Sequence, residues 1–276
     1  MVRASIAGAI LANLLLAMGV AFLLGGLHQH TQEYNAGAAR FYSTMMLLAV
    51  FSLAVPSAFS RFFSATEFFE KEQALNLAVA ILLLAVYVLY LVFMLRTHPE
   101  LFKSAEAGGH DEGGHWGMPR VVGSLVLASV LAAWMSEVLV GAAEATGEAM
   151  GMSSAFIGIV FLAIVGGAAE SGSAIAMARK NRMDLSVGIA LGSCIQIALF
   201  VAPALVLASY FVAPHPLELA FSRPEVGSLL IGVIIGTLVL GDGKANWFKG
   251  VQLIIVYGII ATLFYFLPEL SAATAP

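Results

Sequence analysis

The chain has 276 residues, of which 60% are hydrophobic and only 11% are charged, with a mean hydropathy of +0.93 and a net charge of −4. This composition excludes a water-soluble domain of this size and predicts a multi-pass membrane protein. The small acidic net charge argues against a nucleic-acid partner. A single cysteine, Cys194, excludes an intrachain disulfide.

Apolar runs divide the chain into segments suited to a lipid bilayer. Most are about 18–25 residues long, the length that a helix needs to cross a hydrocarbon core of about 30 Å. We expect helices over residues 4–24, 42–59, 75–95, 121–142, 154–178, 185–211, 226–240 and 248–267. The predicted fold class is therefore all-α, a polytopic transmembrane bundle of about eight helices.

One long polar segment, residues 97–119, interrupts this pattern with charged residues, histidines and glycines. Such a composition predicts a flexible linker. We therefore divide the chain into residues 1–96, a partial first repeat of three helices, the linker 97–119, and residues 120–276, a second repeat of five helices.

Basic residues indicate the orientation of the predicted bundle. Nine lysines or arginines fall on the side of the linker and of the turn at 179–182, and four fall on the other side. Because basic loops are retained in the cytoplasm, we expect the linker to be cytoplasmic and both termini to lie outside. The expected location is a bacterial inner membrane.

The first and sixth predicted helices are similar in character. Residues 4–13 and 185–196 are both rich in small residues, and each carries one amide at mid-depth, Asn13 or Gln196. Helices one to three then correspond to helices six to eight, while helices four and five have no counterpart. Inverted repeats around a midplane ion site are common in transporters, so the pattern predicts such a repeat with an incomplete first half.

Glu170 is the strongest functional signal. A carboxylate at the centre of a membrane helix costs about 2.5–3.5 kcal/mol on insertion scales, so it usually marks an ion or proton path. Gly166 and Gly167 precede it and loosen the helix, which frees backbone carbonyls, and Ser171 adds a hydroxyl. Together these oxygens suit a hard cation such as Ca²⁺. The alternative is a small-residue packing seam in which Glu170 is hydrogen-bonded to a neighbour.

Other polar residues could complete such a site. Ser193 and Gln196 lie at similar depth on the next helix, where they offer neutral oxygens or, alternatively, one interhelical hydrogen bond. Glu137 and Glu144 are seven residues apart on one face of the fourth helix. Glu137 is deep enough to line a path, while Glu144 and Asn13 are weaker candidates.

Three stretches carry a family resemblance: Met135 to Glu144, Val165 to Glu170, and the run from Arg179 to Gln196. They resemble the calcium/proton exchanger branch of the cation/Ca²⁺ exchanger superfamily. The residues from Gly241 to Trp247 resemble the sequence before the last helix of that branch. The resemblance implies ten helices in two inverted repeats, each supplying an essential glutamate from a Gly-Asn-x-x-Glu motif.

The resemblance matches Glu170 to the second of these glutamates, and Gly192, Ser193 and Gln196 to the partner helix of the second repeat. Gly8 to Asn13 resemble the partner helix of the first repeat. Two features depart from the family pattern. The asparagine of the second motif is Gly167 here, and the glutamate helix of the first repeat has no counterpart. We therefore expect a sodium/calcium-exchanger-like chain that is truncated at its N-terminus.

These observations predict Ca²⁺/H⁺ exchange by alternating access, in which Glu170 binds either the cation or a proton. They predict no enzymatic activity and no cofactor besides the transported ions. With one of two acidic ligands, we expect transport by this chain alone to be impaired. Na⁺, K⁺ and Mn²⁺ stay open as alternatives to Ca²⁺.

Three other interpretations stay open. The chain could be a membrane fragment that does not transport, one part of a split exchanger whose remaining helices come from another chain, or a homo-oligomer. An intramembrane hydrolase with Ser193 or Cys194 as nucleophile is disfavoured, because all six histidines fall in loops or at the ends of spans.

Overall fold

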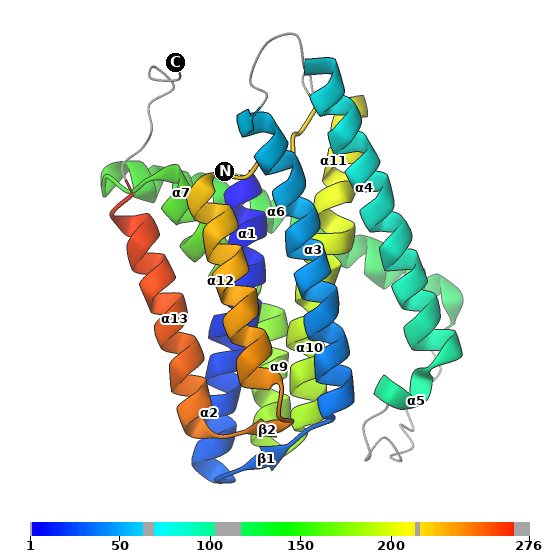
Figure 1. Ribbon diagram of the computed structural model, residues 1–276, viewed down its shortest axis with the longest axis vertical. Coiled ribbons are helices and arrows are strands. Elements are labelled where there is room, and N and C mark those ends of the chain that lie inside the picture. The colour runs from blue at the N-terminus through cyan, green and yellow to red at the C-terminus, as the bar shows by residue number, and fades with distance from the viewer. Residues whose placement is uncertain (1, 63–68, 103–116, 213–215, 268–276) are drawn as a thin grey trace.

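The computed structural model describes residues 2–62, 69–102, 117–212 and 216–267. Long helices run side by side in one bundle, and a two-stranded sheet lies at one end of it (Figure 1). Within these described residues, seven helices are long and apolar enough to cross a membrane, or eight if one bent pair counts as a span. The predicted all-α transmembrane bundle is confirmed.

The first half holds three long helical segments. They are formed by α1 (Val2–Leu11), η1 (Ala12–Ala17) and α2 (Met18–His28), by α3 (Ala36–Phe62), and by α4 (Phe69–Val92) with η3 (Phe93–Thr97). The strand β1 (Gln32–Glu33) separates α2 from α3, and the short α5 (Pro99–Phe102) follows η3. Residues 103–116 of the predicted linker lie outside the described residues.

The second half opens with α6 (Met118–Ala149) and a broken segment made of α7 (Ser154–Phe156), η4 (Ile157–Leu162), α8 (Ala163–Gly166) and α9 (Ala168–Arg179). It continues with α10 (Met183–Gln196), η5 (Ile197–Val201) and α11 (Ala202–Val212), and then with α12 (Arg223–Leu240), β2 (Lys244–Ala245) and α13 (Trp247–Tyr265). Helix α12 begins with a capping box between Ser222 and Glu225, and Asn246 caps α13.

The predicted internal repeat is visible in the packing. The segment α1–η1–α2 and the segment α10–η5–α11 are each interrupted by a π-helical turn near the middle, and they run in opposite directions (Figure 1). Helix α2 packs against α13 as α11 packs against α4, while α3 packs against α12 at the centre. Six helical segments therefore form two inverted sets of three.

Loop contacts follow the same inversion. At one end, β1 pairs with β2 in antiparallel register, with Gln32 opposite Ala245. At the other end, the loop before α12 joins the α3–α4 region, because Leu219 N donates to Asn76 Oδ1 and Phe221 N donates to Ser57 Oγ. Each half therefore contacts the other through one loop, which follows α2 in the first half and α11 in the second half.

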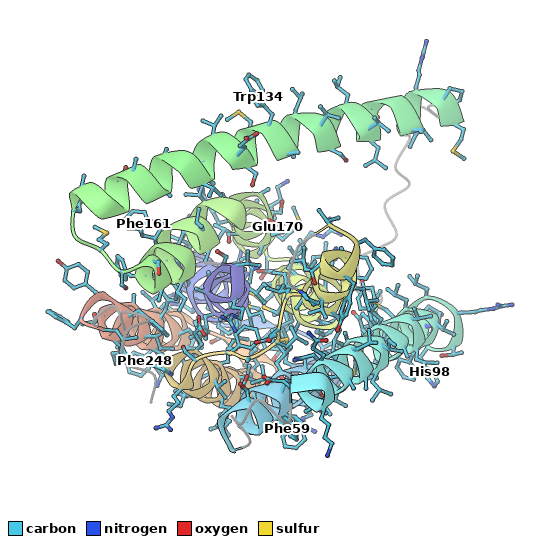
Figure 2. All side chains as sticks on the ribbon, turned by 90° about the horizontal axis from the view of Figure 1, so that it is seen from above. Phe59, His98, Trp134, Phe161, Glu170 and Phe248 are labelled. Atoms are coloured by element: carbon cyan, nitrogen blue, oxygen red, sulfur yellow. The ribbon has the colours of Figure 1, made fainter. Side chains whose placement is uncertain are left out.

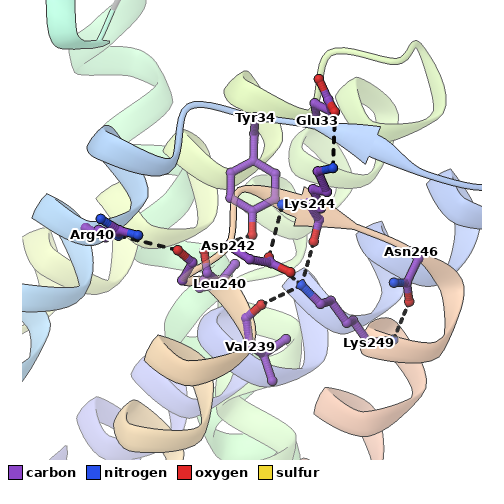
Figure 3. A network of polar contacts seen from close by, with 10 residues as sticks. Glu33, Tyr34, Arg40, Val239, Leu240, Asp242, Lys244, Asn246 and Lys249 are labelled. Carbon is purple, nitrogen blue, oxygen red and sulfur yellow. Dashed lines mark hydrogen bonds and ion pairs between the residues drawn. The ribbon is translucent and has the colours of Figure 1, made fainter.

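A polar network fixes the strand end of the bundle (Figure 3). Lys249 Nζ donates to Asp242 Oδ1 at 2.5 Å and to the carbonyls of Val239 and Lys244. Tyr34 Oη donates to Leu240 O at 3.0 Å. Burial, and then the charge of Asp242, raises the pKa of Tyr34, so the phenol stays a donor. Asp242 is therefore part of a structural turn.

Candidate cation site at the broken helix

The broken segment bends at Gly167. This residue ends α8 and precedes α9 with φ −92° and ψ 10°, and the two parts of the segment meet at 55°. Its N–H donates to Ala163 O at 3.0 Å, while its own carbonyl accepts from Ser171 N at 2.9 Å. The helix bends here, as the Gly166–Gly167 pair predicts, but the Gly167 carbonyl is not freed, because Ser171 N–H donates to it across the bend.

Glu170 lies in the first turn of α9, three residues after this break, and its side chain is exposed. The N-terminal turn of a helix interacts favourably with negative charge. Ala168, Ala169 and Gly172 are exposed around it, so small residues surround the carboxylate on the outer side of α9. A carboxylate on a membrane span is stable only where protein or water covers it.

Ser193 and Glu170 lie at similar distances along their helices from the turn that joins α9 to α10. The two helices α9 and α10 contact each other and are joined by the short turn around Asn181, which has a positive φ of 59°. At 1.5 Å per residue, Glu170 stands about 14 Å above Arg179, and Ser193 stands about 15 Å above Met183. Ser193 is half-buried, and Gln196, one turn further along, is exposed. The predicted similarity in depth is consistent with this arrangement.

Asn13 lies where the first repeat meets this region. Its turn η1 contacts both α9 and α10, and the side chain is only 2% exposed. A Cβ on Gly167 would stand 3.5 Å from Asn13 Oδ1. Among the described residues, Asn13 Oδ1 has no hydrogen-bond partner. From the sequence, Asn13 is a weaker candidate than Gln196. The sequence does not show that Asn13 packs beside Gly167, a residue without a side chain that is 154 positions away.

The remaining acidic candidates lie on α6. This helix crosses the side of the bundle on which Glu170 lies, and Trp134 points away from the other helices (Figure 2). Glu137 is exposed, and the side chain of Glu144 lies outside the described residues. Over the part of the chain that the structure describes, no three His, Cys, Asp or Glu side chains gather into a metal-binding group.

Two further side chains are committed to packing. Ser173 Oγ donates to Ala169 O at 2.9 Å within its own helix. Cys194 is fully buried, and its thiol donates to Ile10 O at 3.4 Å across the contact between α10 and α1. A buried thiol bonded to a carbonyl is poorly placed as a nucleophile, so the geometry does not favour a hydrolase that uses Cys194.

The two repeats differ in what covers their small-residue helices. On α1, a Cβ at Gly8 would overlap the backbone of Ile159, and one at Gly158 would stand 2.9 Å from Ala4 Cβ. The broken segment therefore lies directly against α1. On α10, Gly192 has no atom within 4 Å of such a Cβ among the described residues. In the part of the chain that the structure describes, the surface of α10 at Gly192 is therefore uncovered.

Comparison with known proteins agrees with this architecture. The profile of the sodium/calcium exchanger protein family matches residues 1–96 and 120–266. The Ca²⁺/H⁺ antiporter of Aphanothece halophytica is 36% identical over 280 residues, which cover 97% of this chain and 74% of the relative. The Ca²⁺/H⁺ antiporter ChaA of Bacillus subtilis is 37% identical over 269 residues, 96% of this chain and 75% of the relative.

A solved structure shares the fold as well. The structure of native YfkE superposes with a TM-score of 0.78 at 35% identity and covers 96% of this chain and 75% of that chain. The family match spans both repeats and most of the sequence, and the structural match has the same helical arrangement. The chain belongs to the sodium/calcium exchanger protein family.

Proposed function

We propose that this protein is a cation/proton antiporter that exchanges Ca²⁺ for H⁺ by alternating access. The single observation that carries the proposal is an exposed carboxylate, Glu170, in the first turn after a helix break within a membrane-spanning segment. Relatives that are 36% and 37% identical over nearly the whole chain are Ca²⁺/H⁺ antiporters.

Glu170 couples the movement of Ca²⁺ to that of H⁺, because it binds only one of the two ions at a time. An ionised carboxylate attracts a divalent cation, whereas a protonated one is neutral and holds none. Because the two states exclude each other, each inward or outward movement of the site carries either Ca²⁺ or H⁺. The protein then uses a proton gradient to move the cation.

Neutral oxygens complete the proposed cation shell. Calcium takes six to eight oxygen ligands at about 2.3–2.6 Å, so carbonyls and hydroxyls are needed beside one carboxylate. We assign these roles to the backbone at Gly166 and Gly167, the hydroxyls of Ser171 and Ser193, and the amide of Gln196. Glu137 on α6 is the proposed second acidic group of the path, and Glu144 would lie nearer its mouth.

One carboxylate neutralises only half the charge of a divalent ion in a low-dielectric site. We therefore propose that further helices cover the open face of α10 around Gly192, either from another chain or from a second copy. The open space at Gly192 among the described residues favours a second candidate function, in which these helices bind the cation but transport it only together with the covering helices.

The proposed location is a bacterial inner membrane, with the strand end of the bundle in the cytoplasm. Basic residues support this orientation, because Arg40, Arg179, Lys244 and Lys249 all lie near that end. This orientation puts the C-terminus outside the cytoplasm. A reporter fused after residue 276 should therefore be active if it needs that location, and a reporter that needs the cytoplasm should be inactive.

The test is Ca²⁺ uptake into everted membrane vesicles with an imposed proton gradient, together with Ca²⁺-dependent thermal stabilisation of the purified protein. Uptake by the wild type that is lost in Glu170→Gln, but kept in the exposed control Glu33→Gln, supports the antiporter. Stabilisation that depends on Glu170 without any uptake supports the second candidate function, cation binding without transport by these helices alone. If neither signal depends on Glu170, the proposal is wrong.

A further inference from the structure

Gln32 joins the first repeat to the far end of the helix that carries Glu170. Its Nε2 donates to Ala178 O at 2.8 Å and to Asn181 Oδ1 at 2.9 Å. Both partners are acceptors, so the amide nitrogen must face them. Ala178 O is one of the last carbonyls of α9, which have no partner within their own helix. Gln32 on β1 therefore caps the C-terminal end of α9 at the strand end of the bundle (Figure 1).

The contact is buried and closely fitted. Gln32 is 2% exposed, and Ala178 is fully buried. A Cβ on Gly25, near the end of α2, would overlap Gln32 Oε1, so α2 makes room for the amide. A buried amide that left its acceptors would lose hydrogen bonds that it could not replace. The amide of Gln32 therefore holds its two partners in one position.

Helix α9 depends on such an anchor because it is interrupted at its other end. It has 12 residues, and the bend of 55° at Gly167 separates its direction from that of α8. Packing against α2 and α10 positions the body of α9, while Gln32 fixes its far end. A separate bond, from Asn35 N to Asp184 Oδ1 at 2.6 Å, holds the start of α10.

The length of α9 makes Glu170 sensitive to this anchor. Glu170 lies eight residues before Ala178, which is about 12 Å along the helix axis. A tilt of about 5° at the anchored end would move the carboxylate by about 1 Å over that length. Binding groups must be held within about 0.5 Å of their productive geometry. A small change at Gln32 is therefore large enough to disturb a cation site at Glu170.

We infer that Gln32 is a positioning residue of the cation site, which anchors the end of α9 and thereby sets where Glu170 meets the cation. The inference rests on the proposed function, because it concerns the same carboxylate. Gln32 is not a ligand in this scheme. It acts through the helix that it caps.

The experiment measures Ca²⁺ affinity by calorimetric titration of the purified protein with CaCl₂, and separately the thermal unfolding temperature without Ca²⁺. Gln32→Met keeps the length of the side chain and removes both donated bonds. We expect it to weaken Ca²⁺ affinity by about tenfold, the lower end of the range for residues that orient metal ligands. The matched control is Ser57→Ala, which removes the acceptor of Phe221 N in a buried contact between the repeats at the opposite end. It should lower the unfolding temperature and leave Ca²⁺ affinity unchanged.

Asn181 tests the same contact from its other side. Its φ of 59° suits glycine, so Asn181→Gly keeps the turn and removes one acceptor of Gln32. We expect a smaller loss of Ca²⁺ affinity than in Gln32→Met. The double variant should bind Ca²⁺ no more weakly than Gln32→Met alone, because both changes remove the same bond. Losses that simply add would contradict a shared contact.

The outcomes separate this inference from the proposed function. A Gln32→Met variant with a lower unfolding temperature but unchanged Ca²⁺ affinity, while Glu170→Gln abolishes binding, overturns the inference and leaves the proposed function intact. If Gln32→Met does not fold, unchanged affinity in Asn181→Gly overturns the inference instead. Absence of Ca²⁺ binding by the wild type overturns both.

Discussion

Gly8 lies so close to Ile159 that a Cβ on the glycine would overlap the backbone of the π-helical turn η4. This contact fixes the broken segment, and with it Glu170, against the first repeat. Gly192 on α10 lies at the related position of the second repeat, where none of the described residues comes within 4 Å of an added Cβ. The two glycines allow one matched experiment on packing.

We expect Gly8→Ala to lower the free energy of unfolding by about 1–3 kcal/mol, the usual effect of overpacking a contact that cannot move. Gly192→Ala adds a methyl group into open space and gains about 0.5–1 kcal/mol of helix propensity, so it should be neutral or stabilising in this chain. Thermal and denaturant unfolding in detergent measure both. Equal losses in the two variants would contradict the proposed difference between the repeats.

Gln196 should contribute to ion binding rather than to stability. Its side chain is exposed at the end of α10, so Gln196→Leu removes no buried hydrogen bond of the described residues. We expect Ca²⁺ affinity to fall by about tenfold, as for loss of a ligand or its support, with little change in the unfolding temperature without Ca²⁺.

The control for that experiment is Ser173→Ala. Its hydroxyl lies on the same exposed side of α9 as Glu170, but it donates to Ala169 O of its own helix. Ca²⁺ affinity should therefore be unchanged. A Gln196→Leu variant that binds Ca²⁺ as tightly as the wild type would remove Gln196 from the proposed shell.

Much of the fold could be predicted from the sequence, because membrane helices are specified by local apolar runs. Every predicted span coincides with a helical segment, and the Gly166–Gly167 pair marked the break. Helix ends were less predictable. The fourth helix, expected at 121–142, runs over Met118–Ala149, because its polar ends continue the backbone hydrogen bonds beyond the apolar run.

Long-range polar contacts could not be predicted in this way. Gln32 Nε2 donates to Ala178 O and to Asn181 Oδ1, which are 146 and 149 residues away in the sequence. Such pairs depend on how the two repeats dock, and no local pattern encodes that docking. The burial of Asn13 beside Gly167 could not be predicted from the sequence for the same reason. Glu170 can be predicted, because a charge in an apolar run is a local signal.

Ser57 provides a test of the docking between repeats. Its buried hydroxyl accepts from Phe221 N at 2.8 Å and lies 3.1 Å from the carbonyls of Leu53 and Leu219. Ser57→Ala removes the acceptor of a buried N–H, so we expect a loss of about 1–2 kcal/mol in the free energy of unfolding. Ser52→Ala is the control, because the exposed Ser52 hydroxyl donates only to Leu48 O one turn back. The unfolding temperature of Ser52→Ala should stay within experimental error of the wild type.

Asp242 should make stability depend on acid pH. Partial burial by itself would raise the pKa of Asp242, but hydrogen bonds from Lys249 and Lys244 N, together with the Lys249 charge, outweigh burial and lower it below the ordinary value of 3.8. A carboxyl whose pKa is lowered on folding stabilises the protein above its unfolded pKa. That contribution disappears as the pH falls through the lowered pKa of the folded state.

We therefore expect Asp242→Asn to reduce the free energy of unfolding at neutral pH and to converge with the wild type once the pH falls below the lowered pKa of Asp242 in the folded state, where neither side chain is charged. The Asp242 side chain is 57% exposed, so solvent screens the pair and the difference should be no more than about 1 kcal/mol. Lys244→Met is the comparison, because Lys244 pairs with Glu33 at 3.7 Å between side chains that are 59% and 78% exposed. The effect of Lys244→Met on the free energy of unfolding should be close to zero. A loss in Asp242→Asn that does not depend on pH would show that packing of the turn, rather than the ion pair, stabilises this end of the bundle.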